Sequence, residues 1–167
     1  QLEQSLEAAN TALSYAKDGG SITILNPAPA QPLGENILKL CDFVTPNEIE
    51  AEQITGIPVK SVSNAEVAAD KLLEKGASAA VITLGEQGAL FKDSKQIIHQ
   101  PSFQVGPIVE TTGAGDAFNG GLAVALAEEM PIDKALRFAC ATASISVTRP
   151  GTAPSMPDRN EINTLLT

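Results

Sequence analysis

The residues best suited to chemistry lie in the segment Thr111-Thr112-Gly113-Ala114-Gly115-Asp116. Two glycines flank an alanine, and a carboxylate follows where the apolar spacing predicts the first turn of a helix. Glycine has no Cβ, so the backbone here can approach a ligand closely. The first amides of a helix lack intrahelical acceptors, and the helix places roughly half a positive charge beside them. The segment therefore predicts an anion site, above all for phosphate.

Asp116 is the unusual member of this segment, because a carboxylate next to a bound phosphate is repelled unless another role compensates. As a general base, it would take the proton of a hydroxyl that attacks a phosphoryl group. As an ordinary charge or cap at a helix N-terminus, it would only stabilise the helix, by about 0.5 to 2 kcal/mol. The residues alone leave both interpretations open.

Two other glycine motifs are compared with the same segment. A P-loop requires Lys and then Ser or Thr after its last glycine, whereas Asp116 follows Gly115, so a Walker-type site is excluded. A dinucleotide fingerprint requires glycine at position 118, where Phe118 stands, and belongs on the first strand of a parallel sheet. We therefore expect no site of the NAD type.

The remaining sequence predicts alternating elements that would position this segment. Apolar runs predict strands at 22–25, 42–45 and 79–84. Helical spacing predicts helices at 2–16, 37–40 and 47–54. A capping box at 63–66 predicts a further helix that ends at Gly76. After Gly85, short segments at 89–92, 96–100 and 103–105 predict an antiparallel meander, and helices at 114–129, 131–147 and from 157 follow. The alternation indicates an α/β fold with a mostly parallel sheet.

Composition excludes several classes of protein. The 167 residues carry a net charge of -9 and are 43% hydrophobic, which favours one globular domain and disfavours nucleic acid as a partner. No apolar run approaches about 20 residues, so no membrane span is expected. Cys41 and Cys140 lack disulfide or zinc spacing, which indicates a reducing, cytoplasmic location. His99 is expected to be solvated, and the first residue, Gln1, indicates that the genetic start is missing.

Five segments resemble one known family in the same order along nearly the whole chain. ETTGAGDAFNGGL resembles the carboxy-terminal signature of the ribokinase-type (PfkB-type) carbohydrate kinases, and the likeness extends to LNPAPA at 25–30, TPNEIEAEQITGI at 45–57, VITLGEQGAL at 81–90 and VTRPGTAPSMP at 147–157. The resemblance implies a ribokinase-like three-layer αβα sandwich. Residues 1–167 would be its carboxy-terminal nucleotide-binding and catalytic portion, with the amino-terminal part and the lid missing.

The resemblance also implies an activity, the ATP-dependent phosphorylation of the primary 5-hydroxyl of D-ribose. Asp116 would be the base, the amides of Gly113, Ala114 and Gly115 would form an anion hole, and Glu3 and Asp116 would contact the sugar. Related kinases of fructose, deoxyribose or adenosine remain alternatives, as does a non-catalytic nucleotide-binding module. Without the missing portion we expect little or no activity, and an open strand edge at 22–25 that favours self-association, for example as a homodimer.

Cofactor residues follow from the same resemblance. Asn47 and Glu50 would organise Mg²⁺, and the nucleotide would be contacted by Thr83, Gly85, Gly88 and Cys140. A potassium-like monovalent cation would take oxygens from Glu110, Thr112, Val147, Pro150, Thr152 and Ser155; Glu110 stands where the signature usually has Asp.

Plainer interpretations of these residues stay open. Glu48, Glu50 and Glu52 also fit a solvated helix face. Thr83 and Gly85 fit a strand end and a tight turn, and Glu3 fits a surface acid on an amphipathic helix. Cys41 and Cys140 fit small buried side chains.

Overall fold

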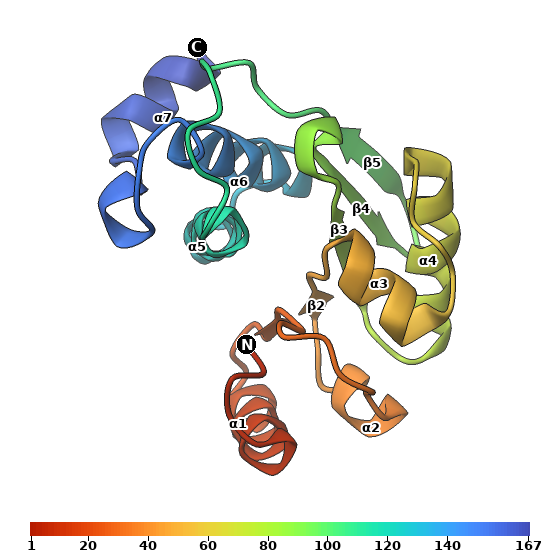
Figure 1. Ribbon diagram of the computed structural model, residues 1–167. Coiled ribbons are helices and arrows are strands. Elements are labelled where there is room, and N and C mark those ends of the chain that lie inside the picture. Colours follow the sequence, from red (N-terminus) through yellow and green to blue (C-terminus); the bar gives the residue numbers. More distant parts are fainter. The chain divides into compact units, whose positions relative to one another are not determined.

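A computed structural model describes residues 1–167, which divide into two compact units. The first unit comprises Gln1–Leu84 and Leu90–His99, and the second comprises Gly85–Ala89 and Gln100–Thr167. Five strands form one sheet in the order β1-β2-β3-β4-β5. Figure 1 labels β2 to β5. None of the helices combines the length and the apolar character needed to cross a bilayer.

The first unit is built on short parallel strands. Its strands are β1 (Ile24–Leu25), β2 (Phe43–Val44) and β3 (Ala79–Thr83), and the sheet goes on with β4 (Ala89–Asp93) and β5 (Ile97–Gln100). Its helices are α1 (Leu6–Asp18), α2 (Glu35–Leu38), α3 (Glu48–Thr55) and α4 (Val62–Glu74). β2 pairs in parallel with both β1 and β3, and Val44 stands opposite Ala80. This pairing confirms the predicted mostly parallel sheet. β1 lies at one edge, as expected.

The core of the first unit joins β3 to α4. The β3 residues Val81 and Ile82 are fully buried, as expected for a strand covered on both faces. On α4, Ala65, Ala68 and Leu72 are also fully buried, at spacings of three and four residues that place them on one helix face. Two small alanines in that face let the helix approach the sheet closely.

Three predicted helix starts are wrong, and that of α2 is one of them, since it begins at Glu35 and not at residue 37. α4 begins at Val62, because the hydroxyl of Ser61 accepts the Asn64 amide at 3.2 Å; the predicted capping box at 63–66 is therefore already inside the helix. α1 begins at Leu6, not at residue 2. Leu2 is instead buried, and its amide donates to the carbonyl of Ala28 at 2.8 Å.

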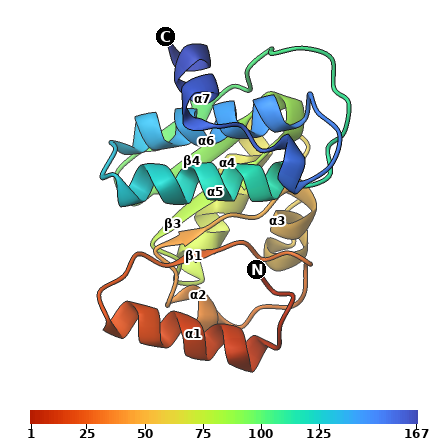
Figure 2. The same cartoon turned by 90° about the vertical axis from the view of Figure 1, so that its left-hand side faces the viewer.

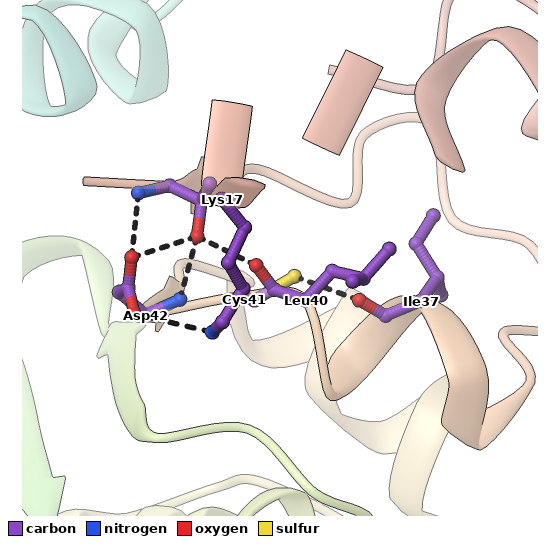
Figure 3. A network of polar contacts seen from close by, with 6 residues as sticks. Lys17, Ile37, Leu40, Cys41 and Asp42 are labelled. Atoms are coloured by element: carbon purple, nitrogen blue, oxygen red, sulfur yellow. Dashed lines mark hydrogen bonds and ion pairs between the residues drawn. The ribbon is translucent and has the colours of Figure 1, made fainter. Parts of the chain in front are cut away.

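A polar network around Asp42 joins the residues that precede β1 and β2, and Figure 3 shows Lys17 and Asp42 within it. The Thr23 amide donates to Asp42 Oδ2 at 2.8 Å, and the Thr23 hydroxyl lies 2.6 Å from the Leu40 carbonyl. Lys17 Nζ lies 3.3 Å from Asp42 Oδ1. Burial alone would raise the pKa of Asp42, but the Thr23 hydrogen bonds and the Lys17 charge outweigh burial and lower this pKa below 3.8.

The network predicts a pH-dependent contribution to stability. Because the folded-state pKa of Asp42 is lowered, its carboxylate stabilises the fold above pH 3.8, and this contribution is lost as the pH falls through the lowered pKa. Urea unfolding of Asp42→Asn at pH 7 should show a loss of about 1 kcal/mol, and the loss should shrink toward pH 2 to 3. Asp18→Asn, at an exposed position, is the control; an equal loss in both variants would contradict the assignment.

The second unit consists mainly of α5 (Ala114–Ala127), α6 (Ile132–Ser146) and α7 (Arg159–Leu166), with short 3₁₀ turns at Gly85–Gln87 and Ala153–Ser155. α5 and α6 pack side by side (Figure 2). Arg159 of α7 pairs with Glu128 at the end of α5, and its guanidinium lies 4.8 Å from the ring centroid of Phe138 on α6. These contacts tie α7 to both longer helices.

The predicted strand at 103–105 is wrong, since these residues form no strand. The Phe103 amide donates to the hydroxyl of Ser144 at 3.1 Å, and the Arg137 guanidinium lies 5.0 Å from the Phe103 ring centroid. Side chains of α6 therefore replace the strand partner that the sequence pattern indicated.

The close packing of α5 on α6 depends on Gly121. A Cβ at this position would lie 2.7 Å from Thr142 Oγ1 and 3.1 Å from the Ala139 Cα. We expect Gly121→Ala to destabilise the protein by about 1 to 3 kcal/mol in chemical unfolding. Gly120→Ala is the matched control: a Cβ there meets nothing within 4 Å, so stability should rise by up to about 1 kcal/mol. Equal effects of both variants would contradict the packing argument.

Candidate functional site

The N-terminus of α5 is open to a ligand. Gly113 adopts the left-handed conformation with φ 82°, and no side chain caps the helix. Glycine is required here, because a Cβ would be strained at this φ and would lie 3.3 Å from the Cβ of Thr152. The chain thus turns sharply into the helix, whose predicted start at Ala114 is confirmed.

The first amides of α5 differ in their partners. The Ala114 amide donates to the Thr111 carbonyl at 3.1 Å, and the first intrahelical bond runs from the Ala117 amide to the Gly113 carbonyl at 2.9 Å. Gly115 lies between them, at a helix position where an amide has no intrahelical acceptor, and Asp116 follows it in the same turn. Of the three amides predicted for the anion hole, that of Ala114 is therefore engaged, that of Gly115 is the donor best placed for an anion, and the role of the Gly113 amide stays a prediction.

Gly115 and Asp116 are both exposed at this helix end. A Cβ on Gly115 would have no heavy atom within 4 Å, so nothing inside the protein requires glycine there. Close approach of a ligand to the backbone would require it. The Asp116 carboxylate stands in the same first turn. This arrangement can hold a phosphoryl group and accept a proton beside it.

The segment before α5 is joined to the loop that follows α6. Glu110 Oε2 accepts the Gly151 amide at 2.7 Å, and the Val147 carbonyl accepts the amides of Val109 and Glu110 at 2.8 and 3.2 Å. The hydrogen bonds to Glu110 from the Gly151 amide and the Thr112 hydroxyl lower its pKa, with a small opposing effect of burial. The sequence pattern did not predict this junction.

Several oxygens assigned to a monovalent cation already accept hydrogen bonds, which bears on whether they could also bind an ion. The Thr152 carbonyl accepts both the amide and the hydroxyl of Ser155, at 3.2 and 2.6 Å. The carbonyl of Val147 and the carboxylate of Glu110 are also engaged, as described above. A hard cation needs oxygens with available lone pairs. As folded here, the carbonyls of Val147 and Thr152 each already accept two hydrogen bonds, so these two oxygens do not fit such an ion.

In the first unit, polar residues gather where the parallel strands end. Asn26 follows β1, and its side-chain amide donates to the Thr45 carbonyl at 2.8 Å. Beyond β2, Asn47 pairs with Thr83 in an isolated parallel bridge, and the Thr83 amide donates to the Pro46 carbonyl at 3.0 Å. Ligands of open α/β sheets bind beyond the carboxyl ends of strands. The structure thus brings two predicted site residues, Asn47 and Thr83, together at such an edge.

Asn47 and Glu50 form a reciprocal cap at the start of α3. Asn47 Oδ1 accepts the Glu50 amide and Glu50 Oε2 accepts the Asn47 amide, both at 2.9 Å. Glu50 is only 7% exposed, so the interpretation as a solvated face is wrong for it. Burial raises the pKa of Glu50; the Asn47 amide opposes the rise, and the nearby Glu48 charge adds to it. The Asn-x-x-Glu spacing is itself a capping-box signal, which the sequence interpretation missed.

No group of three or more His, Cys, Asp or Glu side chains could hold a metal ion. Mg²⁺ commonly takes one or two carboxylates and fills its shell with water and substrate phosphates. Glu50 has a second carboxylate oxygen, Oε1, beside the one that serves the cap. Asn47 and Glu50 therefore fit Mg²⁺ that arrives with a phosphate ligand.

Three predicted nucleotide residues of the second unit have structural explanations. Gly85 and Gly88 both adopt positive φ, and a Cβ on Gly88 would lie 2.0 Å from the Gln100 carbonyl. The thiol of Cys140 is buried, which raises its pKa to about 12, and its Sγ lies 3.9 Å from the same carbonyl. Turn geometry and packing account for these residues, and contact with a nucleotide stays a prediction.

Glu3 precedes α1 and is exposed. Residues 1–3 run beside the segment that follows β1: Gln1 Nε2 lies 3.3 Å from Asn26 Oδ1, and Leu2 bonds to Ala28. Glu3 is thus beside the NPAPA segment, not on the helix as predicted. His99 is exposed on β5, and both cysteines are free and buried.

The sequence is similar to known sugar kinases. The model of the pfkB family carbohydrate kinases matches residues 1–159. Ribokinase of Haemophilus influenzae is 44% identical over 163 residues, which cover 96% of this chain and 52% of that protein. The chain therefore spans about half the length of this curated relative.

Solved structures show the same likeness. Arabidopsis thaliana ribokinase complexed with ribose and ATP superposes with a TM-score of 0.91 at 31% identity, over 96% of this chain and 52% of that one. A ribokinase II of E. coli in complex with ATP and Mg²⁺ gives a TM-score of 0.79 at 25% identity, over 95% and 53%. These similarities confirm the expected ribokinase-like α/β fold. The chain belongs to the pfkB family of carbohydrate kinases.

Proposed function

We propose that this chain carries the phosphoryl-transfer residues of a kinase that phosphorylates the primary 5-hydroxyl of D-ribose with ATP. One observation carries the proposal: the N-terminus of α5 has no side-chain cap, an open Gly115, and an exposed Asp116 in its first turn. The family supports kinase chemistry, and relatives named ribokinase support ribose.

In the proposed reaction, the sugar hydroxyl oxygen attacks the γ-phosphorus of ATP. The bond from the γ-phosphorus to the β,γ-bridging oxygen breaks, ADP leaves, and the hydroxyl proton passes to the Asp116 carboxylate. The amides of Gly115 and Asp116 stabilise the charge on the phosphoryl oxygens, and one such donor contributes about 3 kcal/mol. A carboxylate suffices as base, because proton removal in phosphoryl transfer is late.

Asn47 and Glu50 would hold Mg²⁺ through its water shell or the free carboxylate oxygen. When bound, Mg²⁺ supplies positive charge that neutralises phosphate oxygens. The capping box fixes both side chains before any ligand arrives, so little side-chain entropy is lost on binding. The family resemblance also assigns a potassium-like cation, but no step here depends on one, because the carbonyls of Val147 and Thr152 each already accept two hydrogen bonds.

The variant Glu50→Gln distinguishes the role of Glu50 in capping α3 from its proposed role in binding Mg²⁺. Glutamine keeps an oxygen that accepts the Asn47 amide and removes a buried charge whose pKa is raised. We expect the unfolding midpoint to rise by about 1 to 3 °C and the Mg²⁺ dependence of ATP binding to weaken. Thermal unfolding and calorimetric titration with and without Mg²⁺ measure the two effects. Glu52→Gln, exposed on the same helix, is the control, and a loss of stability in Glu50→Gln alone would contradict the account.

Sugar contacts and a covering surface for the sheet edge complete the proposal. Glu3 and Asp116 are the proposed sugar contacts, and the other half of the family's length would supply the rest. Ile22, before the edge strand β1, is 54% exposed, and Tyr15 on α1 is 76% exposed. We propose that this edge is covered either by that other half or by a second copy of the chain.

The proposed function is tested with the chain alone and with a completed protein, in which the chain is joined to the part of Haemophilus influenzae ribokinase that it does not match. ADP formation is followed with ribose, 2-deoxyribose, fructose or adenosine. We expect the chain alone to bind ATP without sugar-dependent turnover. The completed protein should form ADP fastest with ribose.

Other outcomes assign other functions. If ATP binds but no sugar supports ADP formation in the completed protein, the chain is a non-catalytic nucleotide-binding module. Faster turnover with another of these compounds would identify that compound, and not ribose, as the substrate. Saturable binding of NAD without binding of ATP would contradict the kinase proposal.

A further inference from the structure

We propose that Glu110 is a positioning residue, which holds the turn before α5 by tying it to the loop 147–152 and makes a monovalent cation unnecessary there. The inference rests on the proposed function only in its consequence for ATP binding. All of its residues lie in the second unit.

Glu110 joins two segments that are far apart in the chain. Its carboxylate accepts the Gly151 amide at 2.7 Å and also a hydrogen bond from the Thr112 hydroxyl. Its own amide donates to the Val147 carbonyl at 3.2 Å. Main chain and side chain thus bind the same loop at two points, three residues before Gly113.

The loop in turn contacts the turn that opens the site. A Cβ on Gly113 would lie 3.3 Å from both Cβ and Cγ2 of Thr152, so the loop and the turn are packed without spare room. Gly113 adopts φ 82° and directly precedes the helix amides proposed to bind phosphate. A displacement of the loop would therefore change where these amides lie.

The other side of the loop is anchored as well. The guanidinium of Arg149 pairs with the carboxylate of Glu161 on α7. Glu161 also accepts the Asp158 amide at 2.9 Å as part of the α7 capping box. The loop is thus fixed on both sides of Pro150 by ionised groups, whose hydrogen bonds are stronger than neutral ones.

A cation at this place would compete with these bonds. The oxygens of Glu110, Val147 and Thr152 each already accept hydrogen bonds from protein donors. An aspartate here would be one methylene shorter. The length of the glutamate side chain lets the carboxylate reach the Gly151 amide at 2.7 Å and replace the bridge that a cation would form.

Hydrogen exchange of the Gly151 amide tests the tether directly. Measurements use equal concentrations of potassium chloride and tetramethylammonium chloride. The wild-type rate should agree within about twofold between the salts, whereas Glu110→Ala should exchange about tenfold faster in both. Glu110→Asp should exchange faster than wild type in tetramethylammonium chloride and be rescued by potassium. Asp133→Ala, at an exposed position of the same unit, should match wild type.

Affinity for ATP supplies the second readout. It should agree within about twofold between the two salts for wild type and weaken about fivefold or more in Glu110→Ala. Saturable potassium dependence of wild-type exchange or ATP affinity would overturn the inference, as would unchanged exchange in Glu110→Ala. Exchange needs no nucleotide, so absence of ATP binding with the expected exchange rates would count against the proposed function alone.

Discussion

Replacing Asp116 by asparagine is expected to lower ribose-dependent ADP formation by the completed protein about a thousandfold. Asparagine has nearly the same shape and is also accepted at a helix N-terminus, so the fold should be retained. It cannot take the hydroxyl proton, because the amide is not a base at neutral pH. Affinity for ATP should change little or rise, since a negative charge beside the phosphates is removed. Steady-state turnover and calorimetric titration measure the two effects.

Asp133→Asn is the matched control, because Asp133 occupies the first turn of α6 as Asp116 does that of α5. It should leave turnover of the completed protein within about twofold of wild type. Residual turnover of Asp116→Asn near the wild-type rate would assign Asp116 the role of a helix-end charge. Unfolding curves of both variants exclude loss of the folded state as the cause.

Gly115→Ala is expected to weaken ATP binding about tenfold or more while leaving the fold intact. The new methyl group meets no protein atom within 4 Å, and alanine favours a helix over glycine by up to about 1 kcal/mol. The variant should therefore be as stable as wild type or more stable. Its methyl group would occupy space that the phosphate needs beside the helix amides. Titration with ATP and chemical unfolding measure the two quantities separately.

Gly120→Ala gives the comparison within the same helix. Its Cβ also meets open space, so it should gain similar stability, but it lies more than a turn from the N-terminus and should bind ATP like wild type. Gly113→Ala should instead lose stability, because φ is 82° there and Thr152 is close. Equal ATP affinity of Gly115→Ala and Gly120→Ala would remove the argument for a phosphate at this helix end.

Local patterns predicted those parts of the fold that depend on local physics. The strand predicted at 79–84 is β3, which spans Ala79–Thr83. It could be predicted because a strand that is buried on both faces appears in the sequence as an unbroken apolar run. The start of α5 followed from glycines placed before an apolar helical pattern. The prediction of a strand at 103–105 was wrong, because the Phe103 amide donates to Ser144, which lies 41 residues away in the chain. No local pattern contains that information.

The site was predicted to a similar extent. Gly115 and Asp116 could be found from residue types and spacing, since both act through the end of a single helix. The engagement of the Val147 carbonyl could not, because it depends on pairing with Val109 and Glu110 across the fold. The burial of Glu50 likewise depends on packing around α3, although its capping partner Asn47 was visible in the sequence.

Amide resonances of the ¹⁵N-labelled chain during titration with ATP test the central claim most directly, since they report on the proposed phosphate contacts without requiring turnover. The account predicts that the amides of Gly115 and Asp116 shift saturably and more than that of Gly120, and that Gly115→Ala reduces the effect. Saturation with ATP that leaves the Gly115 and Asp116 amides unshifted would contradict it.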